Sequence, residues 1–268
     1  MRRTGWAAAL AAALCVLATA LTPAGAGASQ TVHLYASFTP DRPGVSTTIT
    51  FGFTVSSHDE PAPSPLLGVN LHLPAGIGLG HTTLGTAVCE PTNLYEQGPE
   101  GCPPNSRLGY GSALAEVPYG PEVVQEHATI DAYRGATVEE HAVILFFAEG
   151  WRPVFAHVIF PGLLLEDNGL FSGSIDTQVP LVPSLPGGPN VSVVQFQSTF
   201  GPKNLNYFRE TNGELVPYKP RGVTVPPVCP RGGYPFAGEF SFEDGTHQTV
   251  HATAPCPAAK AALHTRRR

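Results

Sequence analysis

The residues of this sequence whose type and spacing could do chemistry are its clustered acids. Glu139-Glu140 and Glu166-Asp167 are the densest acidic pairs, and Glu243 lies beside a turn signal near the C-terminus. Two carboxylates can hydrolyse a glycosidic bond when a fold holds them about 5 to 9.5 Å apart. Adjacent residues on a strand point to opposite faces, so such a site has to be assembled from loops. The acids predict, as an alternative function, a secreted carbohydrate-active hydrolase, and they identify no catalytic residue.

The histidines, serines and cysteines form weaker patterns. There are ten histidines but no His-x-His pair, and His247 and His251 would lie roughly 13 Å apart along a strand. The segments Gly109–Ser112 and Phe171–Ile175 lack the G-x-S-x-G motif of serine hydrolases. The cysteines lack the C-x-x-C spacing that zinc sites favour. We therefore expect no metal ion and no other cofactor.

The first 28 residues have the pattern of an export signal. Arg2 and Arg3 precede the apolar run Ala7–Leu21, and small residues up to Ala28 fit an A-x-A cleavage site. Retention of the segment as an anchor is the alternative. We expect cleavage after Ala28 and a secreted or cell-wall-associated chain. No later run reaches the roughly 20 apolar residues of a spanning helix, so we expect no membrane span after cleavage.

The charge distribution excludes one class of partner. Removing residues 1–28 changes the formal net charge from −6 to −8, because Arg2 and Arg3 leave with them. The remaining arginines are scattered, apart from the terminal Arg266–Arg268. Nucleic-acid binding needs a basic stripe that faces the phosphates, so we expect none here.

Four cysteines remain after cleavage: Cys89, Cys102, Cys229 and Cys256. An even number in an exported chain indicates disulfides, and four cysteines allow three connectivities. We favour the two pairs that are local in sequence. A bond between the first two would close the long irregular stretch 76–111, a constraint worth about 3 kcal/mol in the chain-entropy model. A bond between the last two would join the ends of a C-terminal hairpin.

The stretch His141–Phe160 predicts the elements around which the fold is built. Two apolar runs, rich in β-branched and aromatic residues, are separated by a break at Glu149–Arg152. This is the pattern of a hairpin of two buried strands. Val143–Ala148 is apolar without alternation, which is typical of a central strand covered on both faces. We expect the second strand to end at Pro161-Gly162.

Alternation of apolar and polar residues predicts most of the other strands. These lie at 32–38, 48–55, 67–73, 108–117, 128–133, 171–179 and 191–200. Shorter strands are expected near Tyr207 and Val223. Phe236–Phe242 and Gln248–Thr253 predict a final hairpin. Its Asp244-Gly245 signals a two-residue turn, in which the numbers of paired residues sum to 489.

The predicted fold is all-β: an antiparallel β-sandwich, immunoglobulin-like or jelly-roll-like, with long disulfide-stapled loops. Abundant glycine and proline suit the many turns that such a fold needs. We expect one large domain over residues 29–256, followed by a flexible tail at 257–268. The proline-rich segment 180–190 is either a crossover between sheets or a boundary between two lobes.

Several segments carry a family resemblance. One runs from Cys89–Pro91 to Gly101–Gly109, a second from Pro227–Phe236 to Phe242–Gly245, and the early strand ending at Leu73–Gly76 adds to them. In these segments the chain resembles a family of secreted actinobacterial proteins of unknown function. The resemblance implies export and β-rich domains. It brings no activity and no catalytic residue.

The predicted function is that of a secreted, disulfide-stabilised module that binds a partner or has a structural role at the cell envelope. Aromatic residues at expected turns, such as Tyr119, Trp151 and Tyr234, can stack on sugar rings or anchor a partner. Cell-wall polysaccharide and envelope proteins are the partners that this interpretation predicts.

Overall fold

The computed structural model describes residues 30–40, 42, 44–77, 82–119, 122–152 and 155–256. The predicted signal segment 1–28 and the predicted tail 257–268 lie outside the described residues. The described chain is almost entirely β-structure, and its strands pair antiparallel throughout. The prediction of an all-β, antiparallel fold is confirmed.

Most strands extend beyond the predicted ranges, except that those predicted at 171–179 and 191–200 are each one residue shorter, and there is one strand more than predicted. In chain order they are β1 (Gln30–Thr39), β2 (Ser46–Ser57), β3 (Leu66–Pro74), β4 (Arg107–Tyr119), β5 (Glu122–Val138), β6 (His141–Gly150), β7 (Ala156–Glu166), β8 (Phe171–Gln178), β9 (Ser192–Phe200), β10 (Tyr207–Thr211), β11 (Glu214–Tyr218), β12 (Val223–Thr224), β13 (Tyr234–Phe242) and β14 (His247–Ala254). Short strands were expected near Tyr207 and Val223, and both positions are in strands.

Helical structure is confined to the stretch before β4. It consists of α1 (Pro91–Gln97) and two 3-10 turns, η1 (Gly98–Gly101) and η2 (Pro104–Ser106). Within the part of the chain that the structure describes, no helix has the length and apolar character needed to cross a bilayer.

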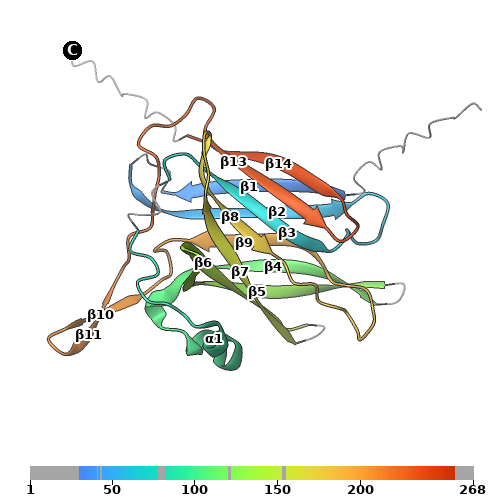
Figure 1. Cartoon of the computed structure of the whole chain (residues 1–268), viewed down its shortest axis with the longest axis horizontal. Coiled ribbons are helices and arrows are strands. Elements are labelled where there is room, and N and C mark those ends of the chain that lie inside the picture. Colours follow the sequence, from blue (N-terminus) through green and yellow to red (C-terminus); the bar gives the residue numbers. More distant parts are fainter. Residues whose placement is uncertain are drawn as a thin grey trace, which may run out of the picture.

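Eleven strands form one continuous sheet in the order β1-β2-β9-β4-β5-β6-β7-β8-β3-β13-β14, and β12 adds to it beside β2. The first and last strands of this order lie side by side. Gln30 connects them, because its Nε2 donates to Thr246 Oγ1 at 2.8 Å and its carbonyl accepts from Gln248 Nε2. The result is a nearly closed, barrel-like sheet around a single interior (Figure 1).

This architecture corrects the predicted sandwich. A sandwich consists of two separate sheets packed face to face, whereas each neighbouring pair along this strand order is hydrogen-bonded. Alternation tells which residues of a strand face inward, and it carries no information about strand order or closure. The segment 180–190 connects β8 to β9, which are not neighbours in the sheet. The β10–β11 hairpin forms a separate ribbon that projects from the left of the sheet in Figure 1.

The central strand β6 is covered on both faces, as its unbroken apolar run predicted. Ile144 and Phe146 belong to the main interior cluster, whereas Val143, Leu145 and Phe147 belong to a second cluster on the outer face. Each of these five side chains is at most 5% exposed. The strand is therefore a wall between two hydrophobic clusters.

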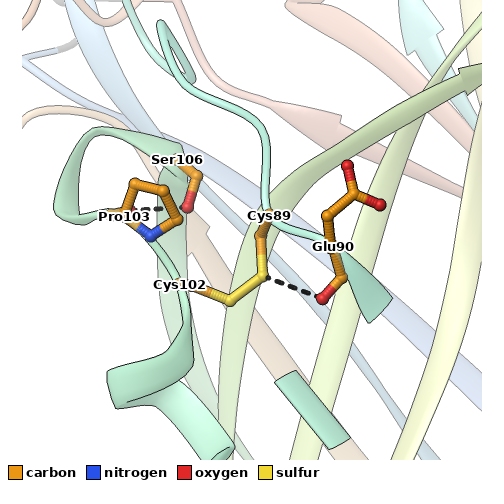
Figure 2. Close-up of a disulfide and its surroundings, with 5 residues drawn as sticks. All are labelled: Cys89, Glu90, Cys102, Pro103 and Ser106. Carbon is orange, nitrogen blue, oxygen red and sulfur yellow. Dashed lines mark hydrogen bonds between the residues drawn. A yellow bond between two sulfur atoms is a disulfide. The ribbon is translucent and has the colours of Figure 1, made fainter. Parts of the chain in front are cut away.

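The stretch that carries α1 supplies the cover for the outer face of β6. Leu94 of α1 is fully buried in the outer cluster, together with Cys89 and Cys102. These two cysteines are disulfide-bonded, with a Cα–Cα distance of 5.0 Å. Figure 2 shows this bond next to Pro103 and Ser106, where the Ser106 hydroxyl donates to the Pro103 carbonyl at 2.6 Å. The irregular stretch predicted here thus has a packing role.

Cys229 and Cys256 form the second disulfide, with a Cα–Cα distance of 5.9 Å. Both disulfides are therefore the sequence-local pairs favoured from the sequence. The second bond ties the chain before β13 to the chain after β14, and both of its cysteines are partly exposed. It fastens the two ends of the final hairpin.

The final hairpin has a different register from the predicted one. Tyr234 pairs with Ala254 and Ser241 with His247, so paired numbers sum to 488 and not 489. Gly245 has φ +81° and Phe242 N donates to the Thr246 carbonyl at 3.0 Å. The turn is a three-residue loop in which the glycine takes the left-handed position, a common alternative to the two-residue turn.

Two other turns also differ from the predictions. Strand β7 continues through Pro161-Gly162 to Glu166, so the predicted end at that dipeptide is wrong. Strands β5 and β6 form a tight hairpin that was not predicted, because Glu139-Glu140 occupies its two turn positions with φ 48° and 68°. A turn with positive φ at both central residues normally takes Asn-Gly, and two glutamates give no such signal.

Candidate functional site

Small residues line up across four neighbouring strands on the inner face of the sheet. Ala113 pairs with Ala128, Ala128 with Gly150, and Gly150 with Ala156. We call these four residues the small-residue belt. Inward side chains normally fill such an interior, so four small residues in one row leave space beside them.

The row continues with large residues on the opposite wall. Ala113 also pairs with Phe196, which pairs with Phe53, which in turn pairs with Leu34. The rings of Phe53 and Phe196 are stacked with centroids 5.6 Å apart. The interior at this level therefore has an aromatic wall facing a wall of alanine and glycine.

An interior cavity of about 220 Å³ lies between these walls. It is larger than the ~150 Å³ apolar cavity that can hold benzene, and smaller than the ~300 Å³ at the lower end of pockets for drug-sized molecules. Its lining is almost wholly apolar and includes Phe51, Leu71, Val158 and Ile175. A dry cavity of this kind favours a small apolar molecule or a single short chain, because water in it finds few hydrogen-bond partners.

Glu126 is the charged exception among the described residues that line the cavity. It lies on β5 two residues before Ala128, and it is only 9% exposed. The backbone N–H of Arg152 donates to its Oε1 at 2.7 Å. A Cβ at position 150 would come within 2.7 Å of the same Oε1, so Gly150 makes room for this side chain.

The loop between β8 and β9 covers one end of the cavity. Val182 and Ser184 line the cavity from this loop. The loop is folded back on itself by a bridge between Pro183 and Asn190. Asn190 Nδ2 also donates to Glu243 Oε1 at 2.6 Å, which ties the loop to the β13–β14 turn. The cover is therefore held in place by hydrogen bonds at its base.

Exposed aromatic residues lie at or next to the ends of three strands that line the cavity. Tyr119, Trp151 and Phe155 are 60%, 59% and 58% exposed. We call these three residues the aromatic rim. Each lies within two residues of a cavity-lining residue of β4, β6 or β7. The rings of Trp151 and Phe155 contact each other, with centroids 5.1 Å apart. Phe155 also contacts His157, whose ring stacks on Phe147 of the outer cluster, so Trp151 and Phe155 lie toward the outer face of the sheet at this end.

The structure divides the predicted carboxylates between different places. Glu139-Glu140 forms the β5–β6 turn, at the end of β6 opposite the cavity-lining Gly150. The interior cavity contains none of the five predicted acids. The surface groove beside the β13–β14 turn contains one of the five, Glu243, next to Asp59, Glu60, Glu122 and Asp244. In neither of these hollows do two of the five predicted acids meet around a sugar.

Asp167 is used in an ion pair on the outside of the sheet. His72 Nδ1 lies 2.6 Å from Asp167 Oδ2, and His72 Nε2 lies 3.6 Å from Glu239 Oε1. The hydrogen bond from His72 is the main reason that the pKa of Asp167 lies below its usual value. The imidazole thereby links the chain after β7 to β3 and β13, which is a structural role.

No group of three or more potential metal ligands lies together within the described residues. His247 and His251 lie four residues apart on the exposed face of β14. All four cysteines outside the predicted signal segment are in disulfides. The structure therefore gives no described residue set from which to build a metal centre.

Neither the cavity nor the position of Glu126 in its lining was predicted from the sequence. Extending the alternation of Ala128 and Ile130 back by two residues places Glu126 on the inner face, so the signal was a charge in an apolar register. The small-residue belt comes from four strands, and only the strand pairing shows that its members are neighbours.

The chain matches no protein-family description, no curated protein and no solved structure. The resemblance to secreted actinobacterial proteins stays a prediction.

Proposed function

We propose that this protein is an exported binding protein that holds an apolar small molecule inside its barrel-like sheet. The observation that carries the proposal is the cavity of about 220 Å³ with its almost wholly apolar lining. Natural cores are packed with few voids larger than a water molecule. An unfilled apolar space therefore destabilises the protein, unless a ligand occupies it.

The surroundings of the cavity support this proposal. The aromatic rim (Tyr119, Trp151 and Phe155) exposes apolar rings at or next to the ends of β4, β6 and β7, three strands that line the cavity, where they can give a poorly soluble ligand its first contact. Rings that combine an apolar body with a polar edge are common at such boundaries. The two disulfides are consistent with an oxidising compartment, as expected for action at or outside the cell envelope.

Fluorescent-probe binding to the purified, oxidised protein tests the proposal. An apolar probe such as N-phenyl-1-naphthylamine should brighten on binding and be displaced by short-chain hydrocarbons. The substitution Ala128→Phe places a ring in the small-residue belt, and we expect it to weaken probe binding by more than about tenfold, which is 1.4 kcal/mol.

Thr129→Phe is the matched control, because Thr129 is the neighbour on the same strand and points to the exposed face. It should bind the probe like the unaltered protein. Ala113→Leu, at the same level on β4, serves if Ala128→Phe folds poorly. Absence of probe binding to the unaltered protein, or equal loss in Thr129→Phe, would contradict the proposal.

A further inference from the structure

We infer that the cavity selects an apolar ligand that ends in a hydrogen-bond-donating group, an alcohol or an amine, and discriminates against the corresponding carboxylic acid. This inference rests on the proposed function and specifies the ligand class for the same cavity. The selecting group is the carboxylate of Glu126.

The first support is the position of Glu126. Among the described residues that line the cavity, Glu126 is the one that is charged. Its neighbours on the inner face include Ala115 and Ala128. An acid placed in an apolar wall makes folding less favourable, because burial removes it from water. Such a group persists where it has a function or is well hydrogen-bonded.

The second support is the way Glu126 is held. The Arg152 N–H fixes Oε1 from one side, and the bare Cα of Gly150 leaves the space that the carboxylate occupies. A carboxylate accepts up to about four hydrogen bonds. It can therefore accept one from a ligand in addition to those made within the protein, and its position is set before the ligand arrives.

The third support is Ser184, in the loop that covers the mouth. Its Oγ is buried and has no hydrogen-bond partner among the described residues, and it lines the same cavity. A buried hydroxyl without a partner is destabilising. This Oγ has less than 1 Å² of accessible surface, so the Ser184 side chain has to rotate before a polar end group can supply the missing partner.

Electrostatics decides which polar end group is accepted. A carboxylate ligand places a second negative charge in a low-dielectric space with Glu126, and two acids sharing such a site disfavour each other's ionised forms. An alcohol donates a hydrogen bond to Glu126, and an ammonium group adds an ion pair. A ligand that lacks a donor makes no such hydrogen bond with Glu126, so it binds through apolar contacts alone.

Competition among octane, octanol, octylamine and octanoate tests the inference, because these ligands share one chain and differ in the end group. With N-phenyl-1-naphthylamine as the displaced probe, we expect octanol and octylamine to bind at least about tenfold more tightly than octanoate. Glu126→Gln keeps the shape of the side chain and removes the charge, so octanoate should then bind within about threefold of octanol.

Glu116→Gln is the matched control. Glu116 lies on β4 next to the cavity-lining Ala115 and Val117 and is itself not part of the lining. It should preserve the full preference against octanoate. Equal binding of octanol and octanoate by the unaltered protein overturns the inference, even if Glu126→Gln folds poorly.

The outcomes separate this inference from the proposed function. Binding of the probe and octane without any preference among end groups leaves the cavity function standing and rejects the role of Glu126. A preference that Glu126→Gln leaves unchanged also rejects that role. Failure of the probe and of all four ligands to bind overturns the proposed function and this inference together.

Discussion

The two ends of the barrel-like sheet have the same antiparallel strand pairing, but side chains fill the interior at one end and leave a cavity at the other. At one end, which we call the packed end, Phe38 lies edge-on to Tyr234 with ring centroids 5.4 Å apart, and Phe236 is 1% exposed. At the other, hollow end, the small-residue belt leaves a cavity of about 220 Å³. Inward residues alternate along the strands in both places. The hollow therefore arises from side-chain size at a few positions, with no change in strand pairing.

Truncating an aromatic residue at each end should give the largest effect. Phe236→Ala at the packed end should lower the free energy of unfolding by about 3–5 kcal/mol, because it opens a cavity among well-packed rings. Phe196→Ala at the hollow end should lower it by about half as much, since Phe196 is only partly buried and already borders empty space. Denaturant titration measures both values. Equal losses would show that the two ends are packed alike.

Removing each disulfide in turn compares the bond in the cover of β6 with the bond that fastens the final hairpin. Cys89→Ala/Cys102→Ala should lower the free energy of unfolding by about 3 kcal/mol from loop entropy, and further because the cover of β6 loosens. Cys229→Ala/Cys256→Ala opens a longer loop, worth about 3.5 kcal/mol, but neither cysteine is buried and only Cys229 packs against the edge of the main interior cluster. We expect the first pair to be the more damaging in denaturant titration. The reverse order would show that loop entropy alone decides.

Substitutions in the β5–β6 turn, at the end of β6 away from the cavity, should increase stability. Glu139→Asn/Glu140→Gly supplies residues that accept the positive φ values of 48° and 68°. We expect a gain of about 1–2 kcal/mol in thermal or denaturant unfolding. Glu139→Gln/Glu140→Gln removes the same charges without relieving the backbone and should gain less. Probe binding should be the same in both variants, since the turn is remote from the cavity.

The ion pair between His72 and Asp167 should give the smallest effect. A lowered pKa means that Asp167 stabilises the fold above the usual carboxyl pKa of about 4, and that this contribution is lost as the pH falls below it. Asp167→Asn should therefore be slightly less stable at neutral pH and less sensitive to acid between about pH 4 and 2. Acid titration followed by circular dichroism measures this. Parallel acid curves would contradict the assigned role.

The parts of the fold that depend on local sequence could be predicted. Alternation located the strands, and the unbroken apolar run Val143–Ala148 correctly indicated a strand covered on both faces. The disulfide pairing also followed from local arguments, because each pair closes a segment that neighbouring residues had already defined.

The parts that depend on strand order could not be predicted. The candidate site needs Ala113, Ala128, Gly150 and Ala156 to be neighbours, and that depends on which strands pair and in which register. The acids that are clustered in the sequence lie in separate parts of the folded structure. Glu126, which lies in the cavity, was hidden because a single glutamate in a strand normally faces water.

The most direct test of the cavity is a crystal of the protein equilibrated under xenon gas. Xenon enters dry apolar cavities of this size without needing a specific contact. The structure predicts a strong xenon site beside Ala113, Ala128 and Ala156, facing Phe196. Side chains that close the space and exclude xenon, or a chain of ordered waters through it, would contradict the claim that this interior is built to hold an apolar ligand.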